Sequence, residues 1–303
     1  ETLADGYDLE RLAARATSGS ADARDLRAVR DTLVLLSEVA DAVAETERLA
    51  DSPLADVLAG ADREAAADLA AELDAALVED PPGTVTQGGL FRRGYDDELD
   101  ALIDEHEAAL EWLETLPDRE KAKTGITHLS VDRNKTDGYY IQVGKSETDQ
   151  VPDAYEEIKT LKNSRRYTIP ELDERERDVL RLEERRHDME HELFDELRER
   201  VADHATLLQD VGRALAGVDC LASLAVHAVE NDWTRPELTD DGHLDIEAGR
   251  HPVVEQTTEF VPNDLQMRPD ERDFLVVTGP NMSGKSTYMR QTALITLLAQ
   301  TGS

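Results

Sequence analysis

Apolar residues recur at alternating spacings of four and three between residues 197 and 218, and this repeat constrains the fold more than any other feature of the sequence. The positions are Leu197, Val201, Leu208, Val211, Leu215 and Val218, with His204 at the third place of the repeat. Such a seam is the pattern by which one helix packs along another. Pro170 suits the first turn of a helix, so we expect a helix that starts there and reaches about Glu230 with a break. Without the break, roughly 60 residues at about 1.5 Å each would extend on the order of 90 Å.

The N-terminal part of the chain also has helical periodicity. Residues 8–45 contain a break at "SGS", and Ser20 is a plausible N-cap for the helix that follows. The apolar positions of that helix recur at spacings of three and four: Leu26, Val29, Leu33 and Leu36. The stretch "ADREAAADLAAELDAAL" and residues 96–123 predict two more helices. The prolines and glycines of "EDPPGTVTQGG" predict the loop between them.

Two later regions have strand character. The runs "THLSVDRN" and "DGYYIQVG" alternate β-branched or aromatic residues with polar ones around the short turn "NKTD", which predicts a β-hairpin. Further along, "HLDIEAGRHPVVEQ" and "DFLVVTGP" also predict strands. The last of these leads directly into a glycine-containing loop.

The charge of the chain is strongly acidic but unevenly distributed. A net charge of −34 disfavours nucleic acid as a partner for most of the surface, and with lysine scarce it is typical of a protein adapted to high salt. Residues 121–167 differ, because they carry nine Lys and Arg against seven Asp and Glu. Six of the seven lysines lie there: Lys121, Lys123, Lys135, Lys145, Lys159 and Lys162. This window predicts a segment that faces a polyanion, the alternative being chance clustering.

The stretch "TGPNMSGKST" has the pattern of a phosphate-binding loop. Gly279 and Gly284 with Lys285 and Ser286 satisfy G-x-x-x-x-G-K-[ST], with the predicted strand "FLVV" before the loop and the predicted helix "STYMRQTALITLLAQ" after it. Glycines let backbone amides surround phosphates, and the start of a helix favours negative charge. Lys285 would reach the outer phosphates and the Ser286 hydroxyl would bind Mg²⁺. The predicted cofactors are therefore ATP and Mg²⁺.

Hydrolysis of ATP requires a further carboxylate that holds Mg²⁺ and positions water, usually on a later strand. The sequence starts at Glu1, without Met, and stops at Ser303 soon after the loop. We therefore expect an excised fragment of a larger protein that does not hydrolyse ATP alone, so no complete catalytic set is assigned.

Several other features have simple structural interpretations. "HDMEH", from His187 to His191, matches the zinc-peptidase pattern H-x-x-E-H, but the dense surrounding charge favours a solvated helix face. We interpret His204 as a packed core histidine, and Cys220 as buried and inert. A single cysteine excludes an intramolecular disulfide and favours a reducing, cytoplasmic interior. No run of 18 apolar residues exists, so we expect no membrane span.

Taken together, the segments resemble the MutS family of DNA mismatch-repair ATPases over nearly the whole chain. "DLERLAARATSGSADARDLRAVRDTL" is similar to the core-helix segment of that family. "RRGYDDELD", "GYYIQV", "TLKNSRRYTIPEL" and "ELFDELRERV" resemble its clamp and lever segments. "GRHPVVE" and "TGPNMSGKSTYMRQTALI" resemble the start of its ATPase domain. The order of these segments makes the resemblance specific, whereas the phosphate loop alone would indicate only an NTPase.

The resemblance implies a mainly α fold: a long helical core and lever bundle with a small β-rich clamp insert and the start of an α/β P-loop ATPase domain of the ABC type. Residues 1–110 would form the first part of the core and lever, and residues 170–232 the second part. Residues 111–169 would form the clamp that closes over DNA, and residues 233–303 the N-terminal part of the ATPase domain. The implied clamp coincides with the lysine-rich window.

The resemblance also implies DNA-binding residues. Lys162 and Asn163 of "TLKN" match positions that contact the DNA backbone in relatives, and such contacts position a duplex without reading its sequence. The further candidates are Lys159, Lys135, Lys145 and Arg133. The chain departs from the family at 156–158, where "EEI" stands in place of the basic residues that relatives often have. That departure weakens the phosphate contact expected there.

The implied nucleotide site comprises the loop and an aromatic residue upstream of it. The loop residues are Gly279, Pro280, Asn281, Met282, Ser283, Gly284, Lys285, Ser286 and Thr287. Asn281 and Met282 would line the phosphates, Thr287 would lie near the α-phosphate, and Ser286 is the candidate metal ligand. Phe260 with Val261 matches the position where relatives pack the adenine, the alternative for Phe260 being ordinary core packing.

The implied partners are double-stranded DNA, a second copy of the chain in the full-length protein, and a MutL-type repair protein. The mismatch-reading module with its Phe-x-Glu wedge, the connector and the later ATPase motifs are not in this sequence. We therefore expect this chain neither to discriminate mismatches nor to dimerise well through ATPase domains. Two alternatives stay open: a MutS-like paralogue that acts on recombination intermediates, and a non-MutS P-loop ATPase with a helical arm, which the position of the loop after the arm disfavours.

Overall fold

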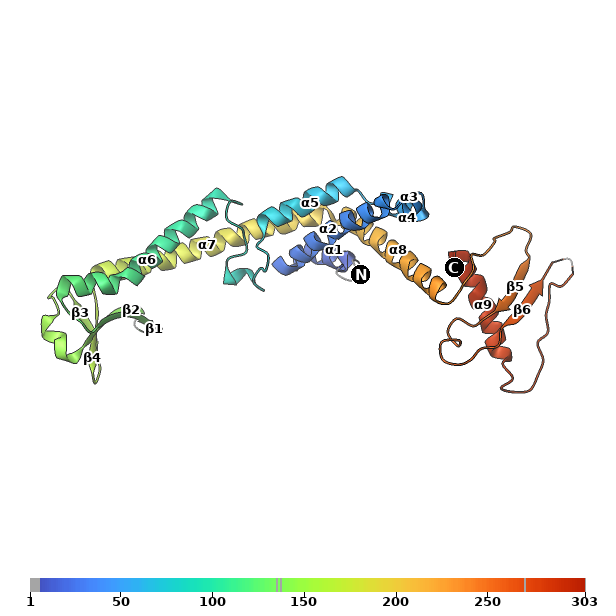
Figure 1. Ribbon diagram of the computed structural model, residues 1–303. Helices are drawn as coiled ribbons and strands as arrows, with labels where there is room; N and C mark the ends of the chain where they lie inside the picture. The colour runs from blue at the N-terminus through green and yellow to red at the C-terminus, as the bar shows by residue number, and fades with distance from the viewer. Residues whose placement is uncertain (1–5, 135, 137, 270, 303) are drawn as a thin grey trace. The chain divides into compact units, whose positions relative to one another are not determined.

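The computed structural model describes residues 6–134, 136, 138–269 and 271–302, and these are mainly helical with small antiparallel sheets (Figure 1). The contacts divide the chain into a first unit, Glu1–Ala216, and a second unit, Gly217–Ser303. The α-helices are α1 (Leu9–Thr17), α2 (Ala23–Glu45), α3 (Glu47–Ala50), α4 (Pro53–Ala59), α5 (Arg63–Ala76), α6 (Asp97–Thr124), α7 (Pro170–Asp203), α8 (Ala205–Glu230) and α9 (Lys285–Thr301). The strands are β1 (Leu129–Asn134), β2 (Gly138–Gly144), β3 (Glu156–Thr160), β4 (Ser164–Thr168), β5 (Leu244–Gly249) and β6 (Asn263–Met267). Two short 3₁₀ helices are η2 (Val85–Gln87) and η3 (Lys145–Gln150).

The start of α2 differs from the prediction. Ser20 is not its N-cap, because the helix begins at Ala23 after Asp22. The Asp22 carboxylate accepts from the Asp25 backbone N–H at 3.0 Å, and the Asp25 carboxylate accepts from the Asp22 N–H at 3.0 Å. This reciprocal capping box satisfies two N–H groups at once. The Ser20 hydroxyl instead lies 2.9 Å from the Ser18 hydroxyl within the turn.

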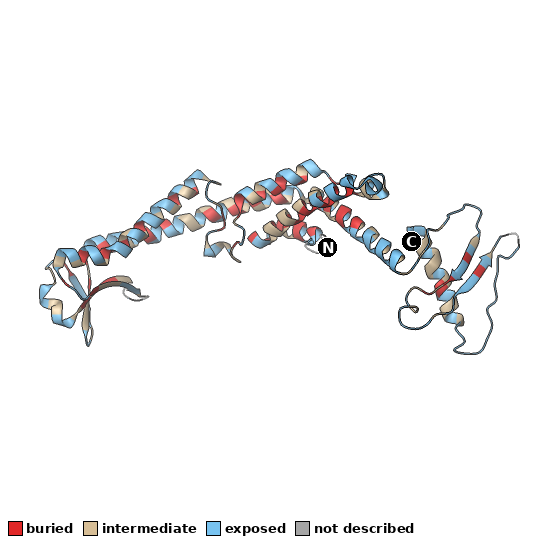
Figure 2. Ribbon diagram, in the orientation of Figure 1, coloured by how far each residue is buried: buried red, intermediate tan, exposed pale blue. Residues whose placement is uncertain are grey.

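The first unit is built around α7. Helix α5 packs on α2, and both α1 and α2 contact α7. The predicted apolar face of α2 is buried. Parts of α7 are buried as well, as the red segments of this helix in Figure 2 show. The fully buried side chains here include Leu26, Leu33, Leu36 and Phe194. The helical periodicity of residues 8–45 therefore predicted the core correctly.

The predicted seam is buried along α7 and α8 except at its third position. Leu197, Val201, Leu208 and Val211 are each 0% exposed, but His204 is exposed. Helix α7 ends at Asp203, and the His204 ring Nδ1 donates to the Arg200 carbonyl at 2.8 Å. The break in the helix turns this side chain onto the last carbonyls of α7, so the prediction of a core histidine was wrong.

A four-stranded antiparallel sheet with the order β1-β2-β4-β3 follows α6. The predicted hairpin is confirmed as β1 and β2, with Leu129 opposite Val143; β3 and β4 were not predicted. One face of the sheet shares a core with α6 and α7, so the sheet is fixed at the end of this helix pair (Figure 1). The core includes Leu113, Leu116, Ile141, Val143, Tyr167 and Leu172.

In the second unit β5 pairs with β6 in antiparallel fashion. The strand expected at "FLVV", before the phosphate loop, is not formed: residues 274–277 have no regular structure, and Phe274 and Val276 are 77% and 68% exposed. A strand of this continuous apolar kind is normally buried between neighbouring strands of a parallel sheet. The described residues supply no neighbouring strand there, which explains the difference.

Helix α8 contains two further departures from the predictions. Cys220 is exposed rather than buried. It lies in the part of α8, from residue 219 to the end of the helix, where all side chains are exposed or half-buried. Val229 in this part is 79% exposed. By length and composition alone α8 could cross a membrane, although no such segment was expected. Its first half packs as a core helix does, with Leu208 and Val211 fully buried.

Candidate nucleotide pocket and basic sheet

The loop at residues 278–287, predicted to bind phosphate, contains several residues with unusual backbone conformations and runs into the start of α9. Gly279 and Gly284 have φ of 154° and 88°, and Met282 has φ of 66°. A Cβ at Gly279 would lie 3.0 Å from the Ser283 hydroxyl, so both the conformation and the space favour glycine there. Gly284 is the N-cap, and α9 begins at Lys285. The loop therefore brings its backbone amides to the N-terminus of a 17-residue helix.

The Lys285 ammonium is held by its own loop. It donates to the Gly279 carbonyl at 2.6 Å and to the Pro280 carbonyl at 2.5 Å. These two bonds keep the positive charge beside the loop backbone rather than extended into solvent. The arrangement gives the pocket a fixed cation next to the start of α9.

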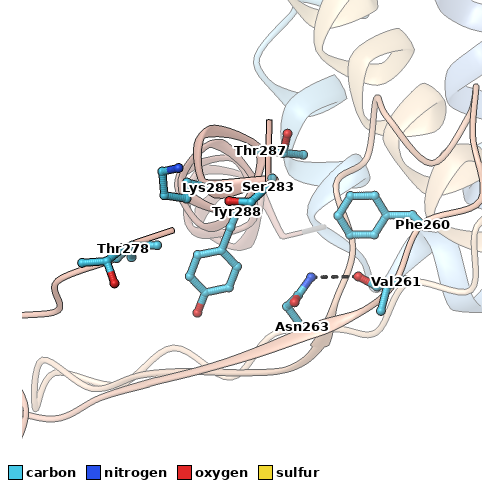
Figure 3. A pocket seen from close by; sticks show the side chains of 10 residues that line it. Phe260, Val261, Asn263, Thr278, Ser283, Lys285, Thr287 and Tyr288 are labelled. Carbon is cyan, nitrogen blue, oxygen red and sulfur yellow. Dashed lines mark hydrogen bonds between the residues drawn. The ribbon is translucent and has the colours of Figure 1, made fainter. Parts of the chain in front are cut away.

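A cavity of about 450 Å³ lies between the loop and the segment that precedes β6 (Figure 3). Its lining residues are Phe260, Val261, Asn263, Val277, Thr278, Ser283, Gly284, Lys285, Thr287 and Tyr288. The Asn263 side-chain amide donates to the Val261 carbonyl at 2.8 Å, and the Tyr288 hydroxyl donates to the Asp264 carbonyl at 3.0 Å. These bonds join the two walls of the pocket to β6.

Six of the eleven predicted nucleotide-binding residues line this cavity: Phe260, Val261, Ser283, Gly284, Lys285 and Thr287. The other five are not among its lining residues: Gly279, Pro280, Asn281, Met282 and Ser286. Met282 is fully exposed, and Ser286 is exposed on the first turn of α9. The prediction missed Tyr288, which helical spacing from Gly284 would have placed on the same side of α9.

The surroundings of Phe260 bear on its two interpretations, a wall of the adenine site or ordinary core packing. It is half-buried and lines the cavity. Its ring also lies 6.5 Å, centroid to centroid, from the ring of buried His251. The side chain therefore belongs to the pocket wall and to the packing behind it at the same time.

In the four-stranded sheet, the structure brings three of the predicted DNA-binding residues together. The Lys145 backbone N–H donates to the Asn163 carbonyl at 3.1 Å, and the Lys145 ammonium donates to the Lys162 carbonyl at 3.4 Å. Lys145 starts η3 directly after β2, while Lys162 and Asn163 form the turn between β3 and β4. The three residues thus lie at one end of the sheet, and all three are exposed.

The remaining DNA-binding candidates lie elsewhere in the sheet. Lys159 is on β3, opposite Arg166 of β4. Arg133 is on β1, with its guanidinium 5.3 Å from the centre of the Tyr139 ring. Because β1 and β3 are the two edge strands, these two candidates are separated by the width of the sheet. Lys135 lies outside the described residues.

A carboxylate fixes the segment that holds Lys145. Glu147 accepts the backbone N–H groups of Thr127 and His128 at 3.1 and 2.9 Å, and its carboxylate lies 2.8 Å from His128 Nδ1. The two backbone N–H donors, with the His128 ring, lower the pKa of Glu147 below its ordinary value. The ionised side chain therefore ties η3 to the start of β1, which positions the Lys145 end of the sheet.

The segment "HDMEH" lies on α7. Among the described residues, no three His, Cys, Asp or Glu side chains are grouped so that they could hold a metal ion. His191 lies 3.9 Å from Asp195 on the exposed side of α7. The expected solvated helix face is found only in part, because Glu190 of the pattern is 1% exposed and accepts the Leu90 backbone N–H at 3.3 Å.

Comparison with known proteins gives matches in the region of the four-stranded sheet and in the region of the loop. Residues 94–185 match MutS family domain IV, and residues 275–303 match MutS domain V. The whole chain is 81% identical to DNA mismatch repair protein MutS 1 of Haloarcula marismortui, covering 33% of that protein. It is 62% identical over its whole length to MutS 1 of Halobacterium salinarum and 46% identical over 98% of its length to MutS of Thermus aquaticus. The chain spans about a third of the length of these relatives.

Proposed function

The chain belongs to the MutS family, and from that premise we propose that it binds duplex DNA through its four-stranded sheet and ATP through the loop 278–287, as part of a DNA mismatch repair protein. The observation that carries the proposal is the cavity between the loop and Phe260, which joins a fixed ammonium group to an aromatic wall. The names of the relatives supply the process, DNA mismatch repair.

The pocket fits a nucleoside triphosphate. A volume of about 450 Å³ is within the range of small-molecule sites. Lys285 and the N-terminus of α9 favour phosphate groups, and the Phe260 ring offers a surface on which a base can stack. Ser286, on the first turn of α9, is the residue that would hold Mg²⁺, which when bound neutralises phosphate charge.

The DNA-binding surface is proposed at the Lys145, Lys162 and Asn163 end of the sheet. These residues come from two connections that the sheet brings together. Ammonium and backbone groups contact phosphates without reading bases, which suits a protein that must accept any sequence. The acidity of the rest of the chain repels a polyanion, so binding is confined to this surface.

The domain boundaries follow from the same proposal. Residues 1–110 and 170–232 form the core and lever, and residues 111–169 form the clamp. Residues 233–303 open the ATPase domain. The partners of the longer protein would be a second copy of itself and a MutL-type repair protein.

Nucleotide binding is tested by titrating the chain with a fluorescent ATP analogue. Replacing Lys285 with Ala should weaken binding by about tenfold to a hundredfold, since a hydrogen bond to a charged group is worth about 1.5–3 kcal/mol. Lys159→Ala, an exposed lysine of the first unit, is the matched control and should bind the analogue as the parent does. Equal affinity of the Lys285→Ala variant would refute the nucleotide site.

DNA binding is tested with a short duplex over a range of salt concentrations. The triple change of Lys145, Lys159 and Lys162 to Glu should weaken binding and flatten the dependence of log affinity on log salt, by about 0.9 for each phosphate that the variant no longer neutralises. A control with the same change of charge replaces the exposed residues Arg11, Arg235 and Arg272 with Glu. If both triple variants bind the duplex equally weakly, net charge and not the sheet determines binding.

A further inference from the structure

Three consecutive residues, the last of β5 and the two that follow it, contact three different parts of the second unit. Gly249 lies against α9, because a Cβ there would be 2.7 Å from the side-chain amide of Gln291. Arg250 donates to the backbone carbonyl of Asn231, just past the end of α8, at 2.5 Å. His251 places its ring 6.5 Å from the ring of Phe260 in the pocket wall. Residues 249–251 therefore lie between the nucleotide pocket, the helix that starts at Lys285, and the end of α8.

The end of α8 is closed by a compact set of hydrogen bonds. The Asn231 backbone N–H and side-chain amide donate to the His227 carbonyl at 3.1 and 2.8 Å, and the Trp233 N–H donates to the Ala228 carbonyl at 2.8 Å. Asp232 has a φ of 53°, the left-handed conformation that commonly ends a helix. The Trp233 ring then packs edge-on against His227, with ring centres 5.2 Å apart.

Two side chains from the segment after β5 hold this helix end. In addition to the Arg250 bond, the Gln256 side-chain amide donates to the Asn231 side-chain oxygen at 2.7 Å. A guanidinium at the C-terminus of a helix is favoured by the partial negative charge of its last carbonyls. Arg250 is itself positioned by Glu255, at 3.4 Å. The end of α8 is thus fastened to the same segment that reaches the pocket.

The polar groups around this segment are incompletely satisfied. Gln291 is 1% exposed, and its side-chain oxygen has no hydrogen-bond partner among the described residues. One carboxylate oxygen of Glu255 is also buried without a hydrogen-bond partner among the described residues. Buried polar atoms without partners are costly, and both of these atoms belong to residues that contact the segment 249–251.

His251 links the segment to the pocket through packing. It is 6% exposed, and its Nδ1 accepts the backbone N–H groups of Val253 and Val254, both at 3.3 Å. These bonds fix the ring, so a displacement of Phe260 by a stacked base acts on a side chain that cannot easily turn away. A movement at Phe260 is therefore passed to the backbone next to Arg250.

We propose that residues 249–251 act as a relay that alters the packing at the end of α8 when the nucleotide pocket fills, with Arg250 as the positioning residue. The proposal rests on the proposed nucleotide site and adds the path by which its occupancy is sensed. Two contacts connect the relay to the pocket and to α9: Phe260 with His251, and Gln291 with Gly249. Two hydrogen bonds connect it to the end of α8, from Arg250 and from Gln256 to Asn231.

Trp233 provides the measurement. The only other tryptophan, Trp112, lies in the first unit, so a Trp112→Phe background makes Trp233 the sole tryptophan emitter. Adding a non-hydrolysable ATP analogue to this protein should shift or quench Trp233 emission. In the same background Arg250→Ala should retain nucleotide binding but lose the Trp233 response. Arg272→Ala, which removes one exposed arginine of the same unit, should keep the response.

The outcomes separate the relay from the nucleotide site. If the Trp112→Phe protein does not bind the analogue, the proposed function fails and the relay fails with it. If it binds without a change in Trp233 emission, or if Arg250→Ala binds with an undiminished change, the relay alone is overturned. If Arg250→Ala abolishes nucleotide binding altogether, the Gln256→Ala variant, at an exposed residue, tests the relay instead. A reduced Trp233 response in this variant supports the relay, and a full response overturns it.

Discussion

The Arg165 guanidinium of β4 pairs with the Glu157 carboxylate of β3 at a distance of 3.3 Å. The Thr160 hydroxyl donates to the same carboxylate. Glu157 belongs to the acidic stretch at 156–158 that stands before "TLKN". Its carboxylate therefore does more than reduce the local positive charge, because it also occupies a guanidinium that would otherwise face solvent on the sheet.

Replacing Glu157 with Gln should raise the affinity of the chain for duplex DNA. Release of Arg165 from an exposed pair worth about 0.2–1 kcal/mol makes one more cation available, and the expected gain is about 1.4-fold to fivefold at low salt. The dependence on salt should become steeper at the same time. The measurement is a duplex titration at several salt concentrations. Glu156→Gln, the neighbouring change of equal charge on β3, is the control; an equal gain in both variants would show that only net charge matters.

Tyr155 and Glu120 join the loop before β3 to the end of α6. The Tyr155 hydroxyl donates to the Glu120 carboxylate at 2.5 Å, and the two residues are 8% and 4% exposed. Lys123 lies 3.4 Å from the other carboxylate oxygen. Tyr155→Phe should destabilise the chain by about 1–3 kcal/mol, since it removes the partner of a buried acceptor. Urea unfolding of the two proteins measures the difference, and Tyr7→Phe, at an exposed tyrosine, should be neutral.

The same pair predicts a pH dependence in alkaline solution. Burial, followed by the hydrogen bond to Glu120, raises the pKa of Tyr155 above its ordinary value. A group whose pKa is raised on folding contributes its stability below the unfolded pKa, about 10 for tyrosine, and loses that contribution as the pH rises towards the folded pKa. The parent should therefore lose stability above about pH 10 faster than Tyr155→Phe does. Parallel loss in the two proteins would exclude this role for Tyr155.

The helical part of the fold could be predicted because its signals are local. The spacing of Leu26, Leu33 and Leu36 reports one helix face wherever the helix packs, and these residues are all fully buried. The break in the seam at His204 was not predictable in the same way. Apolar spacing continues through the break, while the exposure of His204 depends on where α7 ends.

Strand formation depended on partners that the sequence does not identify. The residues of β3 are all exposed and have no apolar alternation, yet the strand forms because β4 pairs with it. The segment at 274–277 has the stronger strand signal and remains irregular, since no strand adjoins it among the described residues. Pairing across a sheet is a tertiary property and outweighs the local preference of either segment.

The candidate nucleotide site also combines features that the local sequence predicts with features that depend on the tertiary fold. The spacing of Gly279, Gly284 and Lys285 predicted a glycine loop that leads into a helix, and the positive φ of both glycines and the start of α9 at Lys285 agree with that conformation. Asn263 was not predicted, since it meets the loop only through the folding of β6 against the cavity, whereas Tyr288 could have been placed there by its helical spacing from Gly284.

Core packing in the first unit gives a stability prediction with an internal control. Leu33 of α2 is 0% exposed, whereas Leu180 of α7 is 43% exposed. Leu33→Ala should lower the free energy of unfolding by about 2–5 kcal/mol, because it leaves a cavity in a packed core. Leu180→Ala should change it by no more than about 0.5 kcal/mol. Urea unfolding followed by circular dichroism compares them, and a similar effect of the two changes would contradict the packing described for α2.

The acidity of the chain predicts that its thermal stability rises with KCl. A net charge of −34 produces self-repulsion in the folded state, and the screening length falls from about 10 Å at 0.1 M salt to about 3 Å at 1 M. The melting temperature should therefore increase over this range. Changing three exposed glutamates of α7 to glutamine, at Glu184, Glu192 and Glu199, removes part of the repulsion without altering the core. That variant should gain less from KCl than the parent, because it begins with fewer like charges to screen. A melting temperature that falls as KCl rises would mean that the ion pairs, which salt weakens, outweigh the repulsion.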